Sequence, residues 1–173
     1  SWIEIKVEMN NSISLIGMAG AGKSSIGEKL AKHLKFDFLD SDLLIEKKYG
    51  QSLQDILNQN GNEKFKEIEE GALLSVEFNQ IVLATGGSAV FCDTAMEHIK
   101  ENSKVIYLEV PYEDISARIS NFSERGLIKR PDQTIQEAYK EREGLYQHFA
   151  DHVVQNNGKI ESCLNKILSL IKF

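Results

Sequence analysis

The sequence predicts an α/β fold in which a parallel β-sheet lies between two layers of helices. Short apolar runs of strand length alternate along the chain with stretches in which apolar residues recur at helical spacing. The runs at 81–84 and 104–108 are typical of strands buried on both faces. Alternating strands and helices imply right-handed crossovers, which place helices on both faces of the sheet. With 173 residues, 42% of them hydrophobic, we expect one globular domain spanning residues 1–173.

The first half of the chain is divided by glycine and serine residues that start or end helices. Gly50 is typical of a residue that ends a helix, and Ser52 has the side chain of a helix N-cap. The expected elements are an edge strand at 3–7, to which we assign no function, a strand at 12–16, a helix over about 26–34, a strand at 36–40, a helix over 43–49, a short helix over 52–57 and a longer helix after Gly61.

The second half continues the alternation after one polar interruption. The expected elements are strands at 81–84 and 104–108, a helix over 112–119 that begins near Pro111, a helix from Thr134 to Phe149, a small strand at 153–154 and a helix over 160–171. Between residues 121 and 133 the periodicity disappears and polar residues dominate. Such a stretch is typical of a mobile surface loop.

Residues 17–24, Gly-Met-Ala-Gly-Ala-Gly-Lys-Ser, fit the P-loop pattern G-x-x-x-x-G-K-[ST] completely. Its glycines let the backbone wrap around an anion, so that N–H groups point at phosphate oxygens. A chance glycine-rich turn is the alternative, but the motif lies between a strand and a helix, as it requires. The motif predicts a nucleoside triphosphate bound with Mg²⁺, and the expected contacts are Gly17, Gly20, Ala21, Gly22, Lys23 and Ser24.

Charged and hydroxyl side chains at this loop have separate expected roles. Lys23 places a positive charge beside the β- and γ-phosphates, and Ser24 offers its hydroxyl to Mg²⁺. Asp40 and Asp42 follow the second strand, where one carboxylate can help to organise Mg²⁺ through water and the other can accept a hydrogen bond from the acceptor's hydroxyl. The alternative is a simple helix N-cap, a role that Asp42 could also fill, and the P-loop favours the functional interpretation.

Composition argues against several classes of partner. The net charge is −6 and the basic residues are scattered, so we expect no nucleic-acid footprint. Cys92 and Cys163 show no C-x-x-C spacing, which favours reduced thiols in a cytoplasmic protein. His148 and His152 lack the residues that accompany zinc ligands. We find no apolar run of membrane-spanning length and no signal-peptide pattern, and we expect a monomer.

Three cations, Lys66, Arg125 and Arg142, are individually most simply explained as solvated helix or loop residues. Together with the other motifs they resemble the shikimate kinase family over nearly the whole chain. The matching segments are the P-loop with Ser25, F-L-D-S-D at 38–42, I-E at 45–46, G-Q-S at 50–52, residues 61–69 against G-E-x-x-F-R-x-x-E, T-G-G at 85–87 against T-G-G-G, and R-E-G-L-Y at 142–146 with A-D at 150–151 against R-x-P-L-Y and A-D.

The resemblance implies a nucleoside-monophosphate-kinase-like P-loop fold with a five-stranded parallel sheet and a mobile lid at about 121–133. It also implies a small-molecule kinase that transfers the γ-phosphoryl group of ATP to the 3-hydroxyl of shikimate. The residues that it places in the site are Asp42 at the ring hydroxyls, Lys66 and Arg142 at the carboxylate, Gly86 and Gly87 along the same pocket, Arg125 at the transferring phosphate, and Arg118 and Ser25 beside the nucleotide.

Three departures separate the chain from the family pattern. Lys66 replaces an arginine, and a lysine cannot make the planar two-pronged contact of a guanidinium with a carboxylate. Ser88 replaces the last glycine of T-G-G-G and adds a side chain near the pocket wall. The lid reads R-G-L-I at 125–128 in place of R-P-L-L, which leaves Arg125 on a more flexible backbone. With Lys66, the acceptor binds more weakly or differs from shikimate.

Two other functions are also compatible with the sequence. A kinase of another small polyol or hydroxy acid, such as gluconate, would share the P-loop and need fewer cations. A nucleotide-binding module without catalysis is compatible with the changes at Lys66 and Ser88, although intact Lys23, Ser24, Asp42 and Arg142 argue against it. A GTPase would need N-K-x-D and D-x-x-G motifs, which we do not find.

Overall fold

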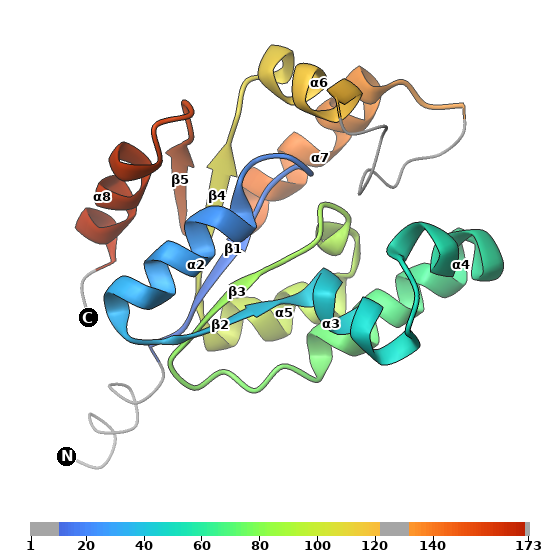
Figure 1. Cartoon of the computed structure of the whole chain (residues 1–173), viewed down its shortest axis with the longest axis horizontal. Helices are drawn as coiled ribbons and strands as arrows, with labels where there is room; N and C mark the ends of the chain where they lie inside the picture. The colour runs from blue at the N-terminus through green and yellow to red at the C-terminus, as the bar shows by residue number, and fades with distance from the viewer. Residues whose placement is uncertain (1–10, 122–131, 172–173) are drawn as a thin grey trace.

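A computed structural model describes residues 11–121 and 132–171 of the chain. Five parallel strands form one sheet in the order β2-β3-β1-β4-β5 (Figure 1). The strands are β1 (Ile13–Ile16), β2 (Asp37–Asp40), β3 (Ile81–Ala84), β4 (Lys104–Glu109) and β5 (His152–Gln155). The expected α/β class with a five-stranded parallel sheet is confirmed.

Helices cover both faces of this sheet. Helices α2 and α8 contact each other on one face, whereas α5 and α7 pack against β4 on the other (Figure 1). The helices are α2 (Lys23–Leu34), α3 (Ser41–Tyr49), α4 (Leu53–Leu74), the 3₁₀ helix η1 (Ala89–Phe91), α5 (Asp93–Asn102), α6 (Tyr112–Asn121), α7 (Ile135–Phe149) and α8 (Ile160–Leu170).

Burial of the strands follows their position in the sheet. Every residue of the central strands β1 and β3 is buried, as their apolar sequences predict. The edge strands β2 and β5 are mostly half-buried or exposed. Helices α3 and α4 share a second, smaller apolar cluster of Ile45, Ile56 and Phe65. The paired helices α3 and α4 therefore have apolar packing of their own beside the main core.

The predicted helix ends are largely those of the structure. Ser52 caps α4 by accepting from the Asp55 N–H at 3.1 Å, and Thr134 caps α7. Gly50 ends α3 with a φ of 65°. The two helices expected on either side of Gly61 form α4, in which Gly61 makes a kink with φ 81° and ψ 171°. The expected strand at 3–7 and most of the expected lid lie outside the described residues.

Helix α5 is absent from the sequence-based assignment, which is wrong for residues 93–102. The helix makes the crossover between β3 and β4, and its buried side chains are Ala95, Met96 and Ile99. The N-cap residue, Cys92, makes no capping hydrogen bond through its side chain. The segment gives only a weak sequence signal for a helix, because the usual N-cap residue is missing and only three apolar residues recur at helical spacing.

The parallel topology places the loops that follow β1, β2 and β3 on the same side of the sheet, at the carboxyl ends of the strands. The strands β2, β3 and β1 are neighbours, so residues 17–24, 40–42 and 85–88 converge there. Open α/β sheets bind their ligands at these carboxyl ends of the strands. None of the described helices is long and apolar enough to cross a membrane.

Candidate active site

A hollow of about 290 Å³ lies where these three loops meet. It combines backbone from the glycine-rich loop, one ammonium group, two hydroxyl groups on α2 and two carboxylates. Its lining residues are Ala19, Gly20, Gly22, Lys23, Ser24, Ser25, Asp40, Asp42, Thr85 and Gly87. The structure thus brings most of the predicted P-loop residues and both predicted aspartates to one place, whereas Gly17 and Ala21 do not line the hollow.

Lys23 is buried at the base of this hollow. Its Nζ donates to the carbonyl oxygens of Gly17 at 2.5 Å and Met18 at 2.9 Å. Burial lowers the pKa of the ammonium to about 8, against the opposing effect of the Asp42 and Asp40 carboxylates. The hollow is therefore lined by a poorly hydrated cation, to which an anion would be strongly attracted.

Gly22 begins α2 in the left-handed conformation, with a φ of 92°. A Cβ atom at Gly22 would also lie 2.8 Å from the Nδ2 atom of Asn156. That amide donates to the Ala21 carbonyl at 2.8 Å and so ties the end of β5 to the loop. Sequence reasoning missed Asn156; its signal was a polar residue directly after a strand that ends at the ligand edge.

Asp40, and not Asp42, caps helix α3. Asp40 Oδ1 accepts from the backbone N–H groups of Asp42 at 2.9 Å and Leu43 at 3.3 Å. Its other oxygen, Oδ2, accepts from the Ser24 hydroxyl at 2.5 Å. The helix-cap alternative therefore holds for Asp40, which also binds the Ser24 hydroxyl, and not for Asp42, whose carboxylate is directed elsewhere.

The carboxylates of Asp42 and Glu69 both lie close to Gly86, on the side where a Cβ atom would project. A Cβ atom at Gly86 would lie 2.5 Å from Asp42 Oδ1 and 3.0 Å from Glu69 Oε2. Burial, followed by the charge of Asp40, raises the pKa of Asp42 to about 6. Only glycine at this position leaves both carboxylates in place.

Glu69 is 2% exposed, although it belongs to a mostly exposed stretch of α4. Its Oε1 accepts from the Ser88 hydroxyl at 2.8 Å. Burial raises the pKa of Glu69 to about 7, and the hydrogen bond from Ser88 opposes that rise. Sequence reasoning did not place Glu69 in the site, although a carboxylate one turn after Phe65 on the apolar stripe of α4 was a usable signal.

Arg142 is also 2% exposed, so its interpretation as a solvated helix residue is wrong. Its guanidinium carbon lies 5.3 Å from the ring centroid of Phe91. A Cβ atom at Gly87 would lie 3.4 Å from Arg142 Nη1. The Tyr146 hydroxyl, one turn further along α7, donates to the Gly87 carbonyl at 2.5 Å. We call Asp42, Glu69, Gly86, Gly87 and Arg142 the Gly86 cluster.

This geometry can be compared with that of known proteins. The shikimate kinase family model matches residues 19–172. A shikimate kinase from Francisella tularensis subsp. novicida is 39% identical over 165 residues, which cover 92% of this chain and 94% of that protein. The chain belongs to the shikimate kinase family. Shikimate kinase from Acinetobacter baumannii, solved in complex with shikimate, matches with a TM-score of 0.84 at 33% identity, over 96% of this chain and 95% of that one. Shikimate kinase from Aquifex aeolicus matches with a TM-score of 0.78 at 29% identity, over 91% and 94%.

The three remaining cations expected from the shikimate kinase pattern do not share one location. Arg118 is half-buried and donates from Nη1 to the Gly20 carbonyl at 2.5 Å, beside the P-loop. Lys66 lies on the exposed side of α4 and does not line the hollow. Arg125, which the family pattern assigns to the lid, lies outside the described residues. The roles of all three stay predictions.

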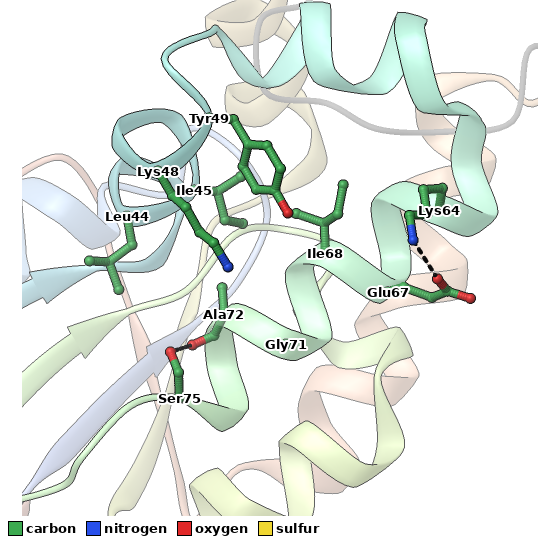
Figure 2. Close-up of a pocket in the computed structure, with 10 residues that line it drawn as sticks. All are labelled: Leu44, Ile45, Lys48, Tyr49, Lys64, Glu67, Ile68, Gly71, Ala72 and Ser75. Carbon is green, nitrogen blue, oxygen red and sulfur yellow. Dashed lines mark hydrogen bonds and ion pairs between the residues drawn. The ribbon is translucent and has the colours of Figure 1, made fainter.

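A second hollow of about 540 Å³ lies between α3 and α4, away from the P-loop (Figure 2). Several of its polar groups interact with one another. Lys64 pairs with Glu67 at 3.3 Å, and the Ser75 hydroxyl donates to the Ala72 carbonyl at 2.6 Å. It contains none of the predicted site residues.

Proposed function

We propose that the protein transfers the γ-phosphoryl group of ATP to the 3-hydroxyl of shikimate, giving ADP and shikimate 3-phosphate. One observation carries this proposal. Asp42 and Gly87 line the P-loop hollow with Lys23 and also belong to the Gly86 cluster. A phosphate on the loop and a hydroxylated acid at the cluster would therefore be neighbours, as direct transfer requires.

The P-loop supplies the nucleotide side of the site. Its backbone N–H groups and the N-terminal end of α2 favour phosphate oxygens, and Lys23 adds a charge that burial makes effective. Ser25 and Arg118 complete the proposed nucleotide contacts. Binding phosphate would exchange the Lys23 bonds to loop carbonyls for bonds to phosphate oxygens.

The Gly86 cluster supplies the acceptor side. The buried Arg142 guanidinium is suited to the carboxylate of shikimate because its planar fork can make two parallel hydrogen bonds. Asp42 is placed to accept from the hydroxyl that attacks. Gly86 and Gly87 have no side chain that would fill the space between Asp42 and Arg142. Lys66 contributes a second positive charge from α4. Arg125 would reach the transferring phosphate from the lid.

Ser24 and Asp40 fit the requirements of Mg²⁺. The hydroxyl and the carboxylate lie within hydrogen-bond distance of each other and offer the oxygen ligands that this cation prefers. These two residues would hold the ion, Asp40 through water. When bound, Mg²⁺ neutralises charge on the phosphate oxygens.

Chemically, a new bond forms between the acceptor oxygen and the γ-phosphorus, while the bond from that phosphorus to the bridging oxygen of ADP breaks. The transition state is loose, so charge stabilisation by Lys23 and Arg125 matters more than deprotonation. Asp42 orients the hydroxyl and takes its proton late in the transfer. Keeping water out of the site prevents wasteful hydrolysis of ATP.

The test is steady-state release of ADP with ATP and Mg²⁺, measured without an acceptor and with shikimate, quinate or gluconate. We expect turnover to depend on shikimate and to be much slower with the other two acids. Turnover that depends on gluconate would replace the proposed acceptor, and ATP binding without acceptor-dependent turnover would indicate a module without catalysis.

A further inference from the structure

Ser88 occupies the position where the family pattern has the last glycine of T-G-G-G. Its side chain is half-buried, and its hydroxyl donates to Glu69 Oε1 at 2.8 Å. This bond joins the segment after β3 to the C-terminal part of α4, 19 residues earlier in the chain. A glycine could not make it. The departure therefore adds a contact to a buried carboxylate.

The second oxygen of the same carboxylate is directed at Gly86. Glu69 Oε2 lies 3.0 Å from the position of a Cβ atom at Gly86, and Asp42 Oδ1 lies 2.5 Å from the same position. One oxygen of Glu69 is thus held by Ser88, while the other borders the place where the acceptor is proposed to bind. In the described part of the chain, Lys66 makes no ion pair with Glu69, although the two are three residues apart on α4.

We propose that Ser88 is a positioning residue for the acceptor: its hydroxyl fixes the Glu69 carboxylate so that Oε2 faces the acceptor's hydroxyl groups. This inference rests on the proposed transfer to shikimate. Ser88 does not touch the reacting atoms and acts through Glu69.

The physical basis is pre-organisation of a buried anion. A glutamate side chain has three rotatable bonds, and the hydrogen bond from Ser88 removes rotational freedom that acceptor binding would otherwise have to restrict. The bond also favours the ionised carboxylate over the neutral form. The other titratable groups that interact electrostatically with Glu69 come from several segments of the chain: Lys23, Asp42, Cys92, Arg142 and Tyr146.

The experiment compares Ser88→Ala, which removes the hydroxyl, with Ser88→Thr, which keeps one. Ser75→Ala is the matched control, because Ser75 donates to a carbonyl at the end of the same helix, α4, outside the site. For each variant one measures kcat, the KM values for shikimate and ATP, and the pH dependence of kcat/KM for shikimate, after checking the fold by circular dichroism.

We expect Ser88→Ala to raise the KM for shikimate about tenfold, since hydrogen bonds to charged groups have this magnitude. The KM for ATP should change less than about twofold on the same reasoning, because Ser88 does not contact the P-loop. Loss of the hydrogen bond raises the pKa of Glu69 further, so the acid limb of the pH profile should move to higher pH. Ser88→Thr should keep the KM for shikimate and the pH profile close to those of the unchanged protein. Ser75→Ala should change neither the KM nor the pH profile.

Two outcomes would overturn the inference in different ways. If the unchanged protein turns over shikimate and Ser88→Ala leaves its KM and pH profile unaltered, Ser88 has no positioning role while the proposed function stands. If the unchanged protein shows no shikimate-dependent turnover, the proposed function fails and the acceptor assignment of Glu69 and Ser88 fails with it.

Discussion

Gly86 lies so close to Asp42 that a Cβ atom on the glycine would be 2.5 Å from Asp42 Oδ1. Real side chains do not tolerate this separation, so any other residue at position 86 must displace the carboxylate. Asp42 lines the P-loop hollow and belongs to the Gly86 cluster. The contact therefore links the identity of one backbone position to the placement of the group proposed to orient the attacking hydroxyl.

Replacing Gly86 by alanine should therefore impair catalysis. We expect Gly86→Ala to lower kcat/KM for shikimate about 100-fold, because a displacement near 1 Å of a catalytic group has effects of this size. The control is Gly71→Ala on α4, where an added Cβ meets no atom within 4 Å. That variant should keep its activity and gain about 0.5–1 kcal/mol of stability. Equal activity in both variants would remove Asp42 from its proposed role.

Lys23 is expected to be required for turnover. Lys23→Ala should lower kcat at least about 100-fold, the range found when a transition-state charge contact is removed. Lys29→Ala, an exposed position on the same helix, controls for general effects on α2. Single-turnover kinetics with saturating ATP measure the chemical step directly. A Lys23→Ala protein with near-normal kcat would refute the role assigned to the ammonium.

Arg142 should act mainly on binding of the acceptor. Arg142→Ala is expected to raise the KM for shikimate about 10- to 100-fold, since it removes charged hydrogen bonds to the carboxylate. Arg142→Lys keeps the charge but not the planar fork, so we expect an intermediate KM. Thermal melting of both variants separates loss of packing against Phe91 from loss of binding. An unchanged KM in a folded Arg142→Ala protein would exclude Arg142 from the acceptor site.

The two cysteines should be unreactive in the folded protein. Cys92 is 0% exposed, and burial raises the pKa of its thiol from 9.0 to about 12, while burial also raises the pKa of Cys163. We expect no labelling by a disulfide reagent at pH 8 until urea unfolds the chain. Because the pKa of the Cys92 thiol is higher in the folded than in the unfolded chain, folding favours the protonated thiol. Its contribution to the free energy of unfolding is complete below pH 9 and is lost as pH rises from 9 towards 12. Rapid labelling of either native thiol would contradict the burial.

The sequence was most informative where local pattern and topology agree. The alternation of strands and helices and the fully apolar β3 predicted the sheet, and the P-loop predicted where its ligand edge lies. Helix α5 was missed because Cys92 gives no capping signal and the helix has only a short apolar stripe. Gly61 was correctly seen as a boundary, although the structure continues helically on both sides of the kink.

Contacts between distant segments were not predictable from pattern alone. The bond from Ser88 to Glu69 and the bond from Asn156 to the Ala21 carbonyl join residues on separate elements, and no local periodicity encodes them. The sequence left open whether Asp42 or another group caps α3, because both aspartates have suitable side chains; the backbone geometry assigns the cap to Asp40. Burial of Arg142 likewise depends on how α7 packs against η1.

The most direct test of the account is identification of the product by ³¹P and ¹H NMR after incubation with ATP, Mg²⁺ and shikimate. We predict equal amounts of ADP and a shikimate monophosphate whose phosphorus couples to the proton at carbon 3. Release of inorganic phosphate with unchanged shikimate, or a phosphate on another hydroxyl, would contradict the proposed placement of the acceptor between Asp42 and Arg142.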